Sequence, residues 1–249
     1  MHRFFVATPE IEGTCLILKD REWRHCRTVL RTQEKDRIAL FDGMGTEYLT
    51  EVAEAGARSA KLKLLRKTTT QRPPYSITLA QALPKNKAMD LIIQKATELG
   101  VYEIIPVLSD RSVVKLEPKE VRSRMERWRD ISIEAAKQCG LNWLPRICEP
   151  KTVKEITAMR SGYHLTLIGS LQPDAKPLWC YLTDLGSVQR NALLMIGPEG
   201  DFTPAEIGMA RSSGFQPLSL GPMVLRCDTA AIYAVSTLSY ELRRPSRSC

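Results

Sequence analysis

The chain has 249 residues, of which 43% are hydrophobic and 26% are charged. This length exceeds one typical domain of roughly 100–150 residues, so we expect two domains with buried cores, and no apolar run is long enough to span a bilayer. The formal net charge of +8 favours a polyanionic partner such as nucleic acid, while a merely solvated basic surface is the open alternative.

The N-terminus and the cysteines indicate a reduced, intracellular protein. The apolar run after Arg3 is too short for the core of a signal peptide, so a cytoplasmic protein without membrane attachment is expected. The seven cysteines form no CxxC pair, which favours reduced thiols. The three histidines lie far apart in sequence, so we expect no metal centre.

The first 70 residues have the pattern of a small β-barrel with one basic helix. Extended or alternating patterns predict short strands at 3–7, 37–41, 47–53 and 61–65. Within this region, 20–30 has helical spacing, with Asp20 as its cap and Trp23, Cys26 and Leu30 on one side. The other faces carry potential cations, namely Arg21, Arg24, His25, Arg27 and Arg31. Both a nucleic-acid contact and a solvated face fit this helix.

The polar stretch 67–74 marks the predicted domain boundary, because it ends in two prolines that lack backbone donors. We expect one domain over 1–70 and a second over 75–249. In the second, apolar strands alternate with helices, which is typical of an α/β domain with a mostly parallel sheet. The predicted strands are 76–83, 103–108, 163–168, 192–196 and 216–220. The predicted helices are 86–99, closed by Gly100, then 120–138 and 153–160.

The loop 196–202 is the first candidate ligand site, because ligands of open parallel sheets bind at the carboxyl ends of strands. Gly197 and Gly200 let the backbone approach a ligand, and Pro198 stiffens the loop. The helix that follows is predicted by a capping box with proline at its first position, over 203–206. The Lys-Ser/Thr pair of a phosphate loop is missing, so backbone bonding to a flat adenine ring fits better, and an ordinary strand-to-helix turn is the alternative.

The second candidate loop, 220–230, also leaves a strand and enters a helix, with Asp228 or Thr229 as the predicted cap. Arg226 precedes the helix N-terminus, where the helix dipole disfavours a cation, so this position favours an anionic or carbonyl partner. A third candidate is 134–145, where a helix ends in amides and small residues; a simple glycine-terminated helix also explains it.

Together, these segments give the chain its resemblance to a known family. They are 25–31, the stretch 83–101, the segment 134–138 and the two loops 196–202 and 220–230. In this order, they resemble the RsmE family of the SPOUT superfamily, which methylates N3 of a uridine in small-subunit (16S) ribosomal RNA. The resemblance implies a PUA-like N-terminal domain for RNA binding and a C-terminal α/β domain threaded in a trefoil knot. It also implies S-adenosylmethionine as cofactor, a homodimer, and ribosomal RNA or the assembled small subunit as partner.

The resemblance also assigns roles to individual residues. By motif match, the implied cofactor-binding residues are Ile196, Gly197, Glu199, Gly200, Leu220, Gly221, Met223 and Leu225, with Arg226 close by. We also predict cofactor contacts for Leu194, Pro198, Ser219 and Thr229. His25 and Arg31 match the RNA-facing motif of the family, and we also predict RNA contacts for Arg24, Arg27, Lys85, Lys87, Gln138 and Trp143. For catalysis, we expect Arg226 to stabilise the uracil anion and either Glu199 or Asp228 to take the N3 proton.

The sequence departs from the family pattern at a few positions. Leu141 and Trp143 stand where arginines are usual, Asp201 replaces a glycine, and Cys227-Asp228 replaces a Thr-Glu pair. Trp143 is expected to be able to stack on an unpaired base. Two alternatives remain open, namely a methyltransferase for another RNA nucleotide and a non-catalytic RNA-binding assembly factor of the same fold.

Overall fold

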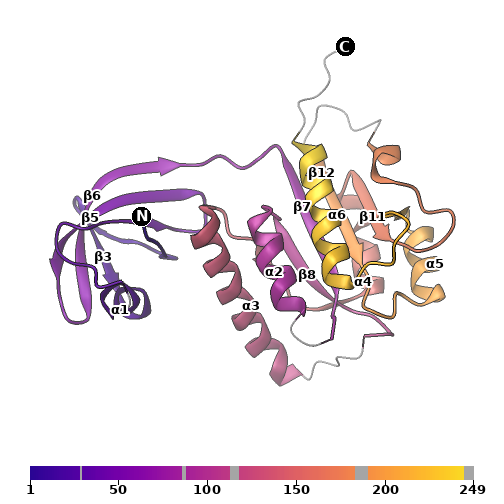
Figure 1. Cartoon of the computed structure of the whole chain (residues 1–249), viewed down its shortest axis with the longest axis horizontal. Helices are drawn as coiled ribbons and strands as arrows, with labels where there is room; N and C mark the ends of the chain where they lie inside the picture. Colours follow the sequence, from indigo (N-terminus) through magenta and orange to yellow (C-terminus); the bar gives the residue numbers. More distant parts are fainter. Residues whose placement is uncertain (29, 86–87, 113–117, 183–189, 244–249) are drawn as a thin grey trace, which may run out of the picture. The chain divides into compact units, whose positions relative to one another are not determined.

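The computed structural model describes residues 1–28, 30–85, 88–112, 118–182 and 190–243. The chain forms two compact units (Figure 1). The N-terminal unit contains Met1–Arg72 together with Ile133–Leu144, and the C-terminal unit contains Pro73–Ser132 and Pro145–Cys249. Two segments distant in sequence therefore build the first unit.

Six strands form the sheet of the N-terminal unit, in the order β1-β4-β5-β6-β3-β2. They are β1 (Arg3–Phe5), β2 (Glu10–Glu12), β3 (Cys15–Lys19), β4 (Arg37–Phe41), β5 (Thr46–Ala55) and β6 (Ser59–Thr69). β1 pairs with β4 in parallel, and the other ladders are antiparallel. The four predicted strands are present, whereas β2 and β3 escaped prediction. β1 and β2 are the two edge strands of this sheet, and no hydrogen-bonded ladder among the described residues joins them.

The helix α1 (Asp20–Thr28) packs on this sheet in the predicted orientation. Trp23 and Cys26 are buried in the same core as Phe4 and Leu16, and Leu30 packs against that core. Burial of this side leaves the basic side chains at the surface, as the helical spacing predicts. The helix begins at Asp20 itself, so Asp20 is its first residue and not the residue before it.

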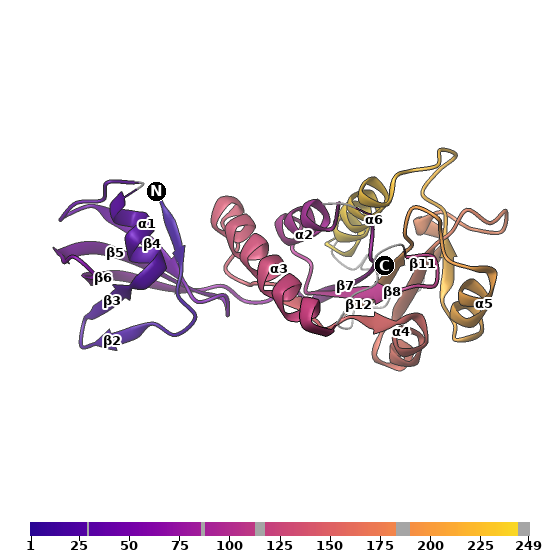
Figure 2. The same ribbon diagram turned by 90° about the horizontal axis from the view of Figure 1, so that it is seen from below.

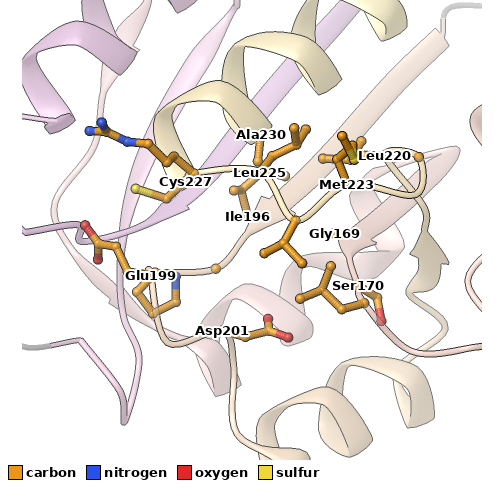
Figure 3. Close-up of a pocket in the computed structure, with 16 residues that line it drawn as sticks. Gly169, Ser170, Ile196, Glu199, Asp201, Leu220, Met223, Leu225, Cys227 and Ala230 are labelled. Carbon is orange, nitrogen blue, oxygen red and sulfur yellow. The ribbon is translucent and has the colours of Figure 1, made fainter.

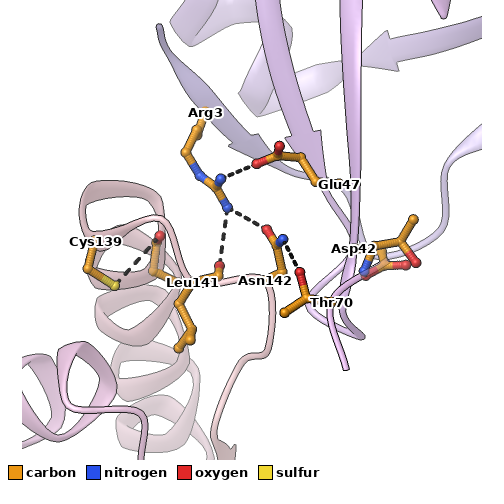
Figure 4. A network of polar contacts seen from close by, with 9 residues as sticks. Arg3, Asp42, Glu47, Thr70, Cys139, Leu141 and Asn142 are labelled. Carbon is orange, nitrogen blue, oxygen red and sulfur yellow. Dashed lines mark hydrogen bonds and ion pairs between the residues drawn. The ribbon is translucent and has the colours of Figure 1, made fainter. Parts of the chain in front are cut away.

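The segment Ile133–Leu144 is attached to the N-terminal strands by a polar network (Figure 4). The Arg3 guanidinium donates to the carbonyl of Leu141 at 3.2 Å and to Oδ1 of Asn142 at 2.7 Å, and it also pairs with Glu47. The Asn142 amide in turn donates to Oγ1 of Thr70 at 2.9 Å. These contacts explain why a segment predicted in the second domain folds with the first unit.

Trp143 completes this attachment. Its Nε1 donates to the carbonyl of Thr70 at 2.9 Å, and the Arg72 guanidinium carbon lies 4.2 Å from the centre of its ring. Gly45 lies so close to the ring that an added Cβ would be 2.4 Å from Cζ2 of Trp143. The indole is therefore engaged by three residues of its own unit.

Seven parallel strands form the sheet of the C-terminal unit. They are β7 (Tyr75–Ala82), β8 (Glu103–Leu108), β9 (Arg146–Ile147), β10 (Lys151–Thr152), β11 (Leu165–Gly169), β12 (Arg190–Ile196) and β13 (Gln216–Leu218). The order is β10-β8-β7-β12-β11-β13, and β9 also pairs with β8. Every ladder of this sheet in the described part of the chain is parallel, which confirms the predicted α/β class.

Helices cover both faces of the parallel sheet (Figure 2). One face is covered by α2 (Ala88–Glu98) and α6 (Cys227–Leu242), and the other by α4 (Val153–Ala158) and α5 (Pro204–Ser212). The long helix α3 (Pro118–Cys139) adds Trp128 to the α2/α6 core. Two short 3-10 helices lie at Met159–Gly162 and Leu178–Tyr181.

The local signals for helix ends have mixed outcomes. Gly100 has a φ of 78° just beyond α2, and α5 begins with the predicted capping box between Thr203 and Glu206. In contrast, α6 begins at Cys227 with Arg226 as its cap residue, so the predicted cap at Asp228 or Thr229 is wrong. Asp228 lies instead in the first turn, where a carboxylate also interacts favourably with the helix dipole.

Candidate functional site

A cavity of about 310 Å³ opens at the carboxyl ends of β11 and β12 and beside the start of α6 (Figure 3). Its volume is near the lower end of the roughly 300–1,000 Å³ typical of small-molecule sites. It is lined by Gly169, Ser170, Leu171, Ile196, Gly197, Pro198, Glu199, Asp201, Leu220, Gly221, Met223, Val224, Leu225, Arg226, Cys227 and Ala230. This is the position expected for a ligand of an open parallel sheet.

Both loops chosen from the sequence line this cavity. The predicted cofactor-binding residues in its wall are Ile196, Gly197, Pro198, Glu199, Leu220, Gly221, Met223, Leu225 and Arg226. The other predicted positions lie outside the wall. Leu194 is fully buried in the α2/α6 core, the carbonyl of Gly200 accepts from Arg111, the Ser219 hydroxyl accepts from Gly221 N–H at 3.3 Å, and Thr229 is exposed on α6.

Sequence reasoning missed one whole wall of the cavity. This wall consists of Gly169, the last residue of β11, and of Ser170 and Leu171 just after it, and β11 pairs directly with β12. Because the same carboxyl-end rule applies to every strand of the sheet, the Gly-Ser pair after the predicted strand 163–168 was a usable signal. The structure also adds Asp201 and Cys227 to the wall, two positions where the chain departs from the family pattern.

A tight turn shapes the loop between Gly197 and Asp201. Asp201 N–H donates to the carbonyl of Pro198 at 3.0 Å, and Asp201 has a φ of 59°, which favours glycine. Its Oδ1 accepts from Phe202 N–H at 2.7 Å. A Cβ added to Gly197 would be 3.1 Å from this oxygen and 3.3 Å from the Phe202 ring. The aspartate therefore takes a glycine-like conformation and compensates with a local hydrogen bond.

Asp201→Gly is expected to leave the stability close to that of the parent, because glycine adopts positive φ without strain and this gain offsets the lost hydrogen bond to Phe202 N–H. Both variants lose the carboxylate that accepts from Phe202 N–H, but Asp201→Ala also keeps the positive-φ strain, so its free energy of unfolding should be about 1–2 kcal/mol lower than that of the glycine variant. Urea denaturation of the two variants measures the difference. An alanine variant that is the more stable of the two would contradict the strain at this position.

Glu199 connects three elements at the cavity. Its Oε1 accepts from Lys85 N–H, in the loop after β7, at 2.9 Å. Its carboxylate also lies close to Cys227 at the start of α6 (Figure 3). Burial, followed by the charges of Glu199 and Asp228, raises the pKa of the Cys227 thiol to about 11. Glu199 therefore contacts both the loop after β7 and the start of α6.

The raised pKa predicts that the Cys227 thiol stays protonated in ordinary buffers, and thiols react as thiolates. At about pH 8, Cys227 should be alkylated much more slowly than the exposed Cys180, and its rate should rise steeply only as the pH approaches 11. Peptide mass spectrometry after timed alkylation measures both rates. Glu199→Gln removes one of the charges and is expected to lower the Cys227 pKa. Equal rates at the two cysteines would refute the raised pKa.

The predicted catalytic residues Arg226 and Asp228 are close neighbours. The Arg226 guanidinium lies 3.4 Å from Oδ2 of Asp228. The arginine side chain is 82% exposed, whereas that of Asp228 is only 12% exposed and accepts from Thr229 N–H at 2.9 Å. With Glu199, an exposed cation and two carboxylates surround the start of α6.

The sequence matches known RNA methyltransferases along most of its length. The profile of an RNA methyltransferase domain matches residues 71–239, and that of an RNA methyltransferase PUA domain matches 18–65. A ribosomal RNA small subunit methyltransferase E of Synechocystis is 32% identical over 240 residues, which cover 96% of this chain and 77% of that protein. The chain belongs to the ribosomal RNA small subunit methyltransferase E family.

Solved structures of similar proteins agree with this assignment. A ribosomal RNA small subunit methyltransferase E of Neisseria gonorrhoeae, bound to S-adenosyl methionine, has a TM-score of 0.85 and 32% identity, over 96% of this chain and 97% of that one. A putative methyltransferase of Legionella pneumophila, in complex with the bound cofactor SAM, has a TM-score of 0.86 and 32% identity, over 96% of each chain. The fold of this family member, including its PUA-like unit, is thus that of its relatives.

In this member of the family, the residues predicted to contact RNA lie in both units. Arg24, His25 and Arg27 are exposed on α1, and Arg31 is exposed just beyond it with a φ of 53°. Gln138 is exposed near the end of α3, and Lys85 is exposed after β7. Lys87 lies outside the described residues. Trp143 is half-buried, and its contacts with Gly45, Thr70 and Arg72 give it a structural role in its own unit.

No helix formed by the described residues is both long enough and apolar enough to span a membrane. Nor do these residues gather three His, Cys, Asp or Glu side chains into a group that could hold a metal ion. The cysteines of the described part of the chain are all unpaired.

Proposed function

We propose that the protein transfers a methyl group from S-adenosylmethionine to N3 of a uridine in small-subunit (16S) ribosomal RNA. The observation that carries this proposal is the cavity formed by the loops after β11 and β12 and the loop before α6. These loops contain the motif residues of the family, and the cavity lies at the one edge of the sheet where the predicted catalytic residues also gather.

The cavity wall suits S-adenosylmethionine. Ile196, Leu220 and Leu225 provide apolar surface for the adenine ring, and Ser170 and Asp201 provide polar groups. The Asp201 carboxylate complements a cofactor that carries positive charge on its sulfonium and amino groups. When bound, the cofactor supplies the electrophilic methyl group, so the chain has to position the uridine and to favour its anion.

We assign the anion-stabilising role to Arg226 and the proton-accepting role to Glu199. Uridine N3 is a weakly acidic imide nitrogen, and a guanidinium beside the uracil oxygens lowers the cost of removing its proton. The exposed Arg226 side chain is accessible to an incoming base. Each carboxylate accepts one backbone N–H, but Glu199 is exposed whereas Asp228 is largely buried. Glu199 is therefore better placed to receive a proton from substrate, and Asp228 to orient Arg226.

We further propose that the N-terminal unit binds RNA through the basic face of α1 and that the protein is a homodimer. The dimer is supported by exposed side chains on the C-terminal unit, namely Tyr233 and Tyr240 on α6 and Met223 and Val224 at the cavity, because a partner subunit would cover such apolar surface. Light scattering after gel filtration measures the mass, and a monomer at micromolar concentration would argue against the dimer.

The trefoil knot of this family and cytoplasmic localisation remain predictions for this chain.

Mass spectrometry of small-subunit ribosomal RNA tests the reaction. The substrate is taken from a strain that lacks the gene, either as naked RNA or as assembled subunits. It is incubated with the protein and isotopically labelled S-adenosylmethionine. We expect one labelled methyluridine, with the label on N3, in at least one of these substrates. Label on another nucleotide would move the target and keep the enzyme class. Absence of both transfer and affinity for S-adenosylmethionine would favour a non-catalytic assembly factor of the same fold.

A further inference from the structure

A turn after β8 contacts the loop that lines the cavity. In this turn, over 109–112, Ser112 N–H donates to the carbonyl of Ser109 at 3.0 Å, and the two hydroxyl oxygens lie 2.9 Å apart. Ser109 is only 8% exposed. The turn is thus closed by its own hydrogen bonds and anchored in the C-terminal unit.

Two hydrogen bonds join this turn to the segment after β12. Arg111 Nη1 donates to the carbonyl of Gly200 at 2.9 Å, and Asp110 N–H donates to Oε1 of Glu206 at 2.9 Å. Glu206 is buried and also forms the capping box of α5 with Thr203. The turn therefore connects the loop 197–201 to the start of α5.

Gly200 is the member of the loop that faces Arg111. A Cβ built on it would be 3.7 Å from Cβ and Cδ of Arg111, which is ordinary packing contact. Its neighbours Glu199 and Asp201 line the cavity, whereas Gly200 does not. The arginine therefore bonds to the loop through a residue outside the cavity wall.

The loop 197–201 is fixed at two successive residues by two different neighbouring loops. Lys85 N–H, after β7, bonds to Glu199, and Arg111, after β8, bonds to Gly200. In the sheet, β7 lies between β8 and β12, so these contacts reach the loop from adjacent strands. A loop held in its binding shape loses less conformational entropy when a ligand binds.

We propose that Arg111 is a positioning residue for cofactor binding, which holds the Gly200 carbonyl and with it the shape of the loop 197–201. The inference rests on the proposed function, because S-adenosylmethionine is the ligand that this loop would serve. A guanidinium donating to a carbonyl forms a charge-assisted hydrogen bond, which is stronger than a neutral one. Arg111→Ala removes the bond without placing any new group in the cavity.

Calorimetry with S-adenosylmethionine in the absence of RNA tests this role on the full chain. We expect Arg111→Ala to raise the dissociation constant by about 5–30-fold. Arg111→Lys keeps the positive charge and one donor nitrogen, so its dissociation constant should lie between those of the parent and of Arg111→Ala. The matched control is Arg122→Ala, which removes a cation from an exposed arginine paired with Glu126 on α3 and should leave the affinity unchanged.

Steady-state kinetics separate positioning from general damage. Arg111→Ala should raise the KM for S-adenosylmethionine by a similar factor and retain kcat at saturating cofactor, whereas a smaller folded fraction would lower kcat at an unchanged KM. Unchanged affinity in Arg111→Ala, or the second kinetic pattern, would overturn the inference. If the parent protein binds the cofactor and Arg111→Ala binds equally well, only this inference fails. If the parent does not bind it, the proposed function fails and the inference with it.

Discussion

Arg226→Ala is expected to lower kcat for methyl transfer by about 10²–10³-fold, the usual loss when a group that stabilises developing negative charge is removed. Cofactor affinity should stay close to that of the parent, because 82% of the arginine side chain is exposed and only a small part of it belongs to the cavity wall. Single-turnover methylation of ribosomal RNA and calorimetry with S-adenosylmethionine measure the two effects separately.

Two further variants sharpen this experiment. Arg226→Lys keeps the positive charge beside Asp228 but loses the planar donor pair, so it should recover only part of the rate. Arg211→Ala removes a cation that pairs with Asp174 on the surface and should leave turnover unaffected. A parallel loss of cofactor affinity in Arg226→Ala would instead show that the guanidinium holds the cofactor, and unchanged turnover would remove Arg226 from catalysis altogether.

Gly45→Ala is expected to destabilise the N-terminal unit by about 2–5 kcal/mol, the sum of a positive-φ penalty and of overpacking. Gly45 has a φ of 98°, and its new Cβ would lie 2.4 Å from Trp143 and 2.9 Å from the carbonyl of Thr70. Displacing the indole also breaks its bond to Thr70. Hydrogen exchange at Gly45 N–H, which donates to the carbonyl of Asn142, reports the loss directly.

The control for this variant is Gly13→Ala. Gly13 has a φ of 62°, but no atom lies within 4 Å of its added Cβ, so only the conformational penalty of about 1–2 kcal/mol applies. The difference between the two variants isolates the contact with Trp143. Equal destabilisation of both proteins would mean that the indole moves aside at no cost, and Trp143 would again be a candidate for stacking on a base.

Local sequence patterns predicted most helices of the C-terminal unit because their signals lie within one or two turns. The apolar spacing of α2 with Gly100 at its end, and the capping box of α5, both appear in the structure. The short strands β2 and β3 did not appear in the prediction. β2 has only three residues and pairs with β3, which pairs in turn with the distant β6. Pairing across such separations leaves little trace in a local window.

Only part of the candidate site was predicted. Motif residues indicate which loops form the site, but they do not indicate which atoms of those loops face the cavity. The two loops line the cavity, yet Leu194 is buried in the core and Gly200 faces Arg111. Side chains alternate between the two faces of a strand, so Leu194 and Ile196 both point to the α2/α6 side of β12. Ile196 ends the strand and reaches the cavity, whereas Leu194 lies two residues earlier and is covered by the core. The cavity wall formed by residues 169–171 lies beside the loop 196–201 because β11 and β12 are neighbours in the sheet, and local sequence does not reveal this strand order.

The sequence alone determined the α/β class, the basic helix and the two loops that line the cavity, because periodicity, glycine placement and motif residues are local properties. Tertiary structure decided which atoms meet across the chain. It attaches Ile133–Leu144 to the N-terminal unit through Arg3, whose contact with Leu141 spans 138 positions, and it joins Arg111 to Gly200 across 89. Such contacts depend on the packing of whole elements, which no local pattern records.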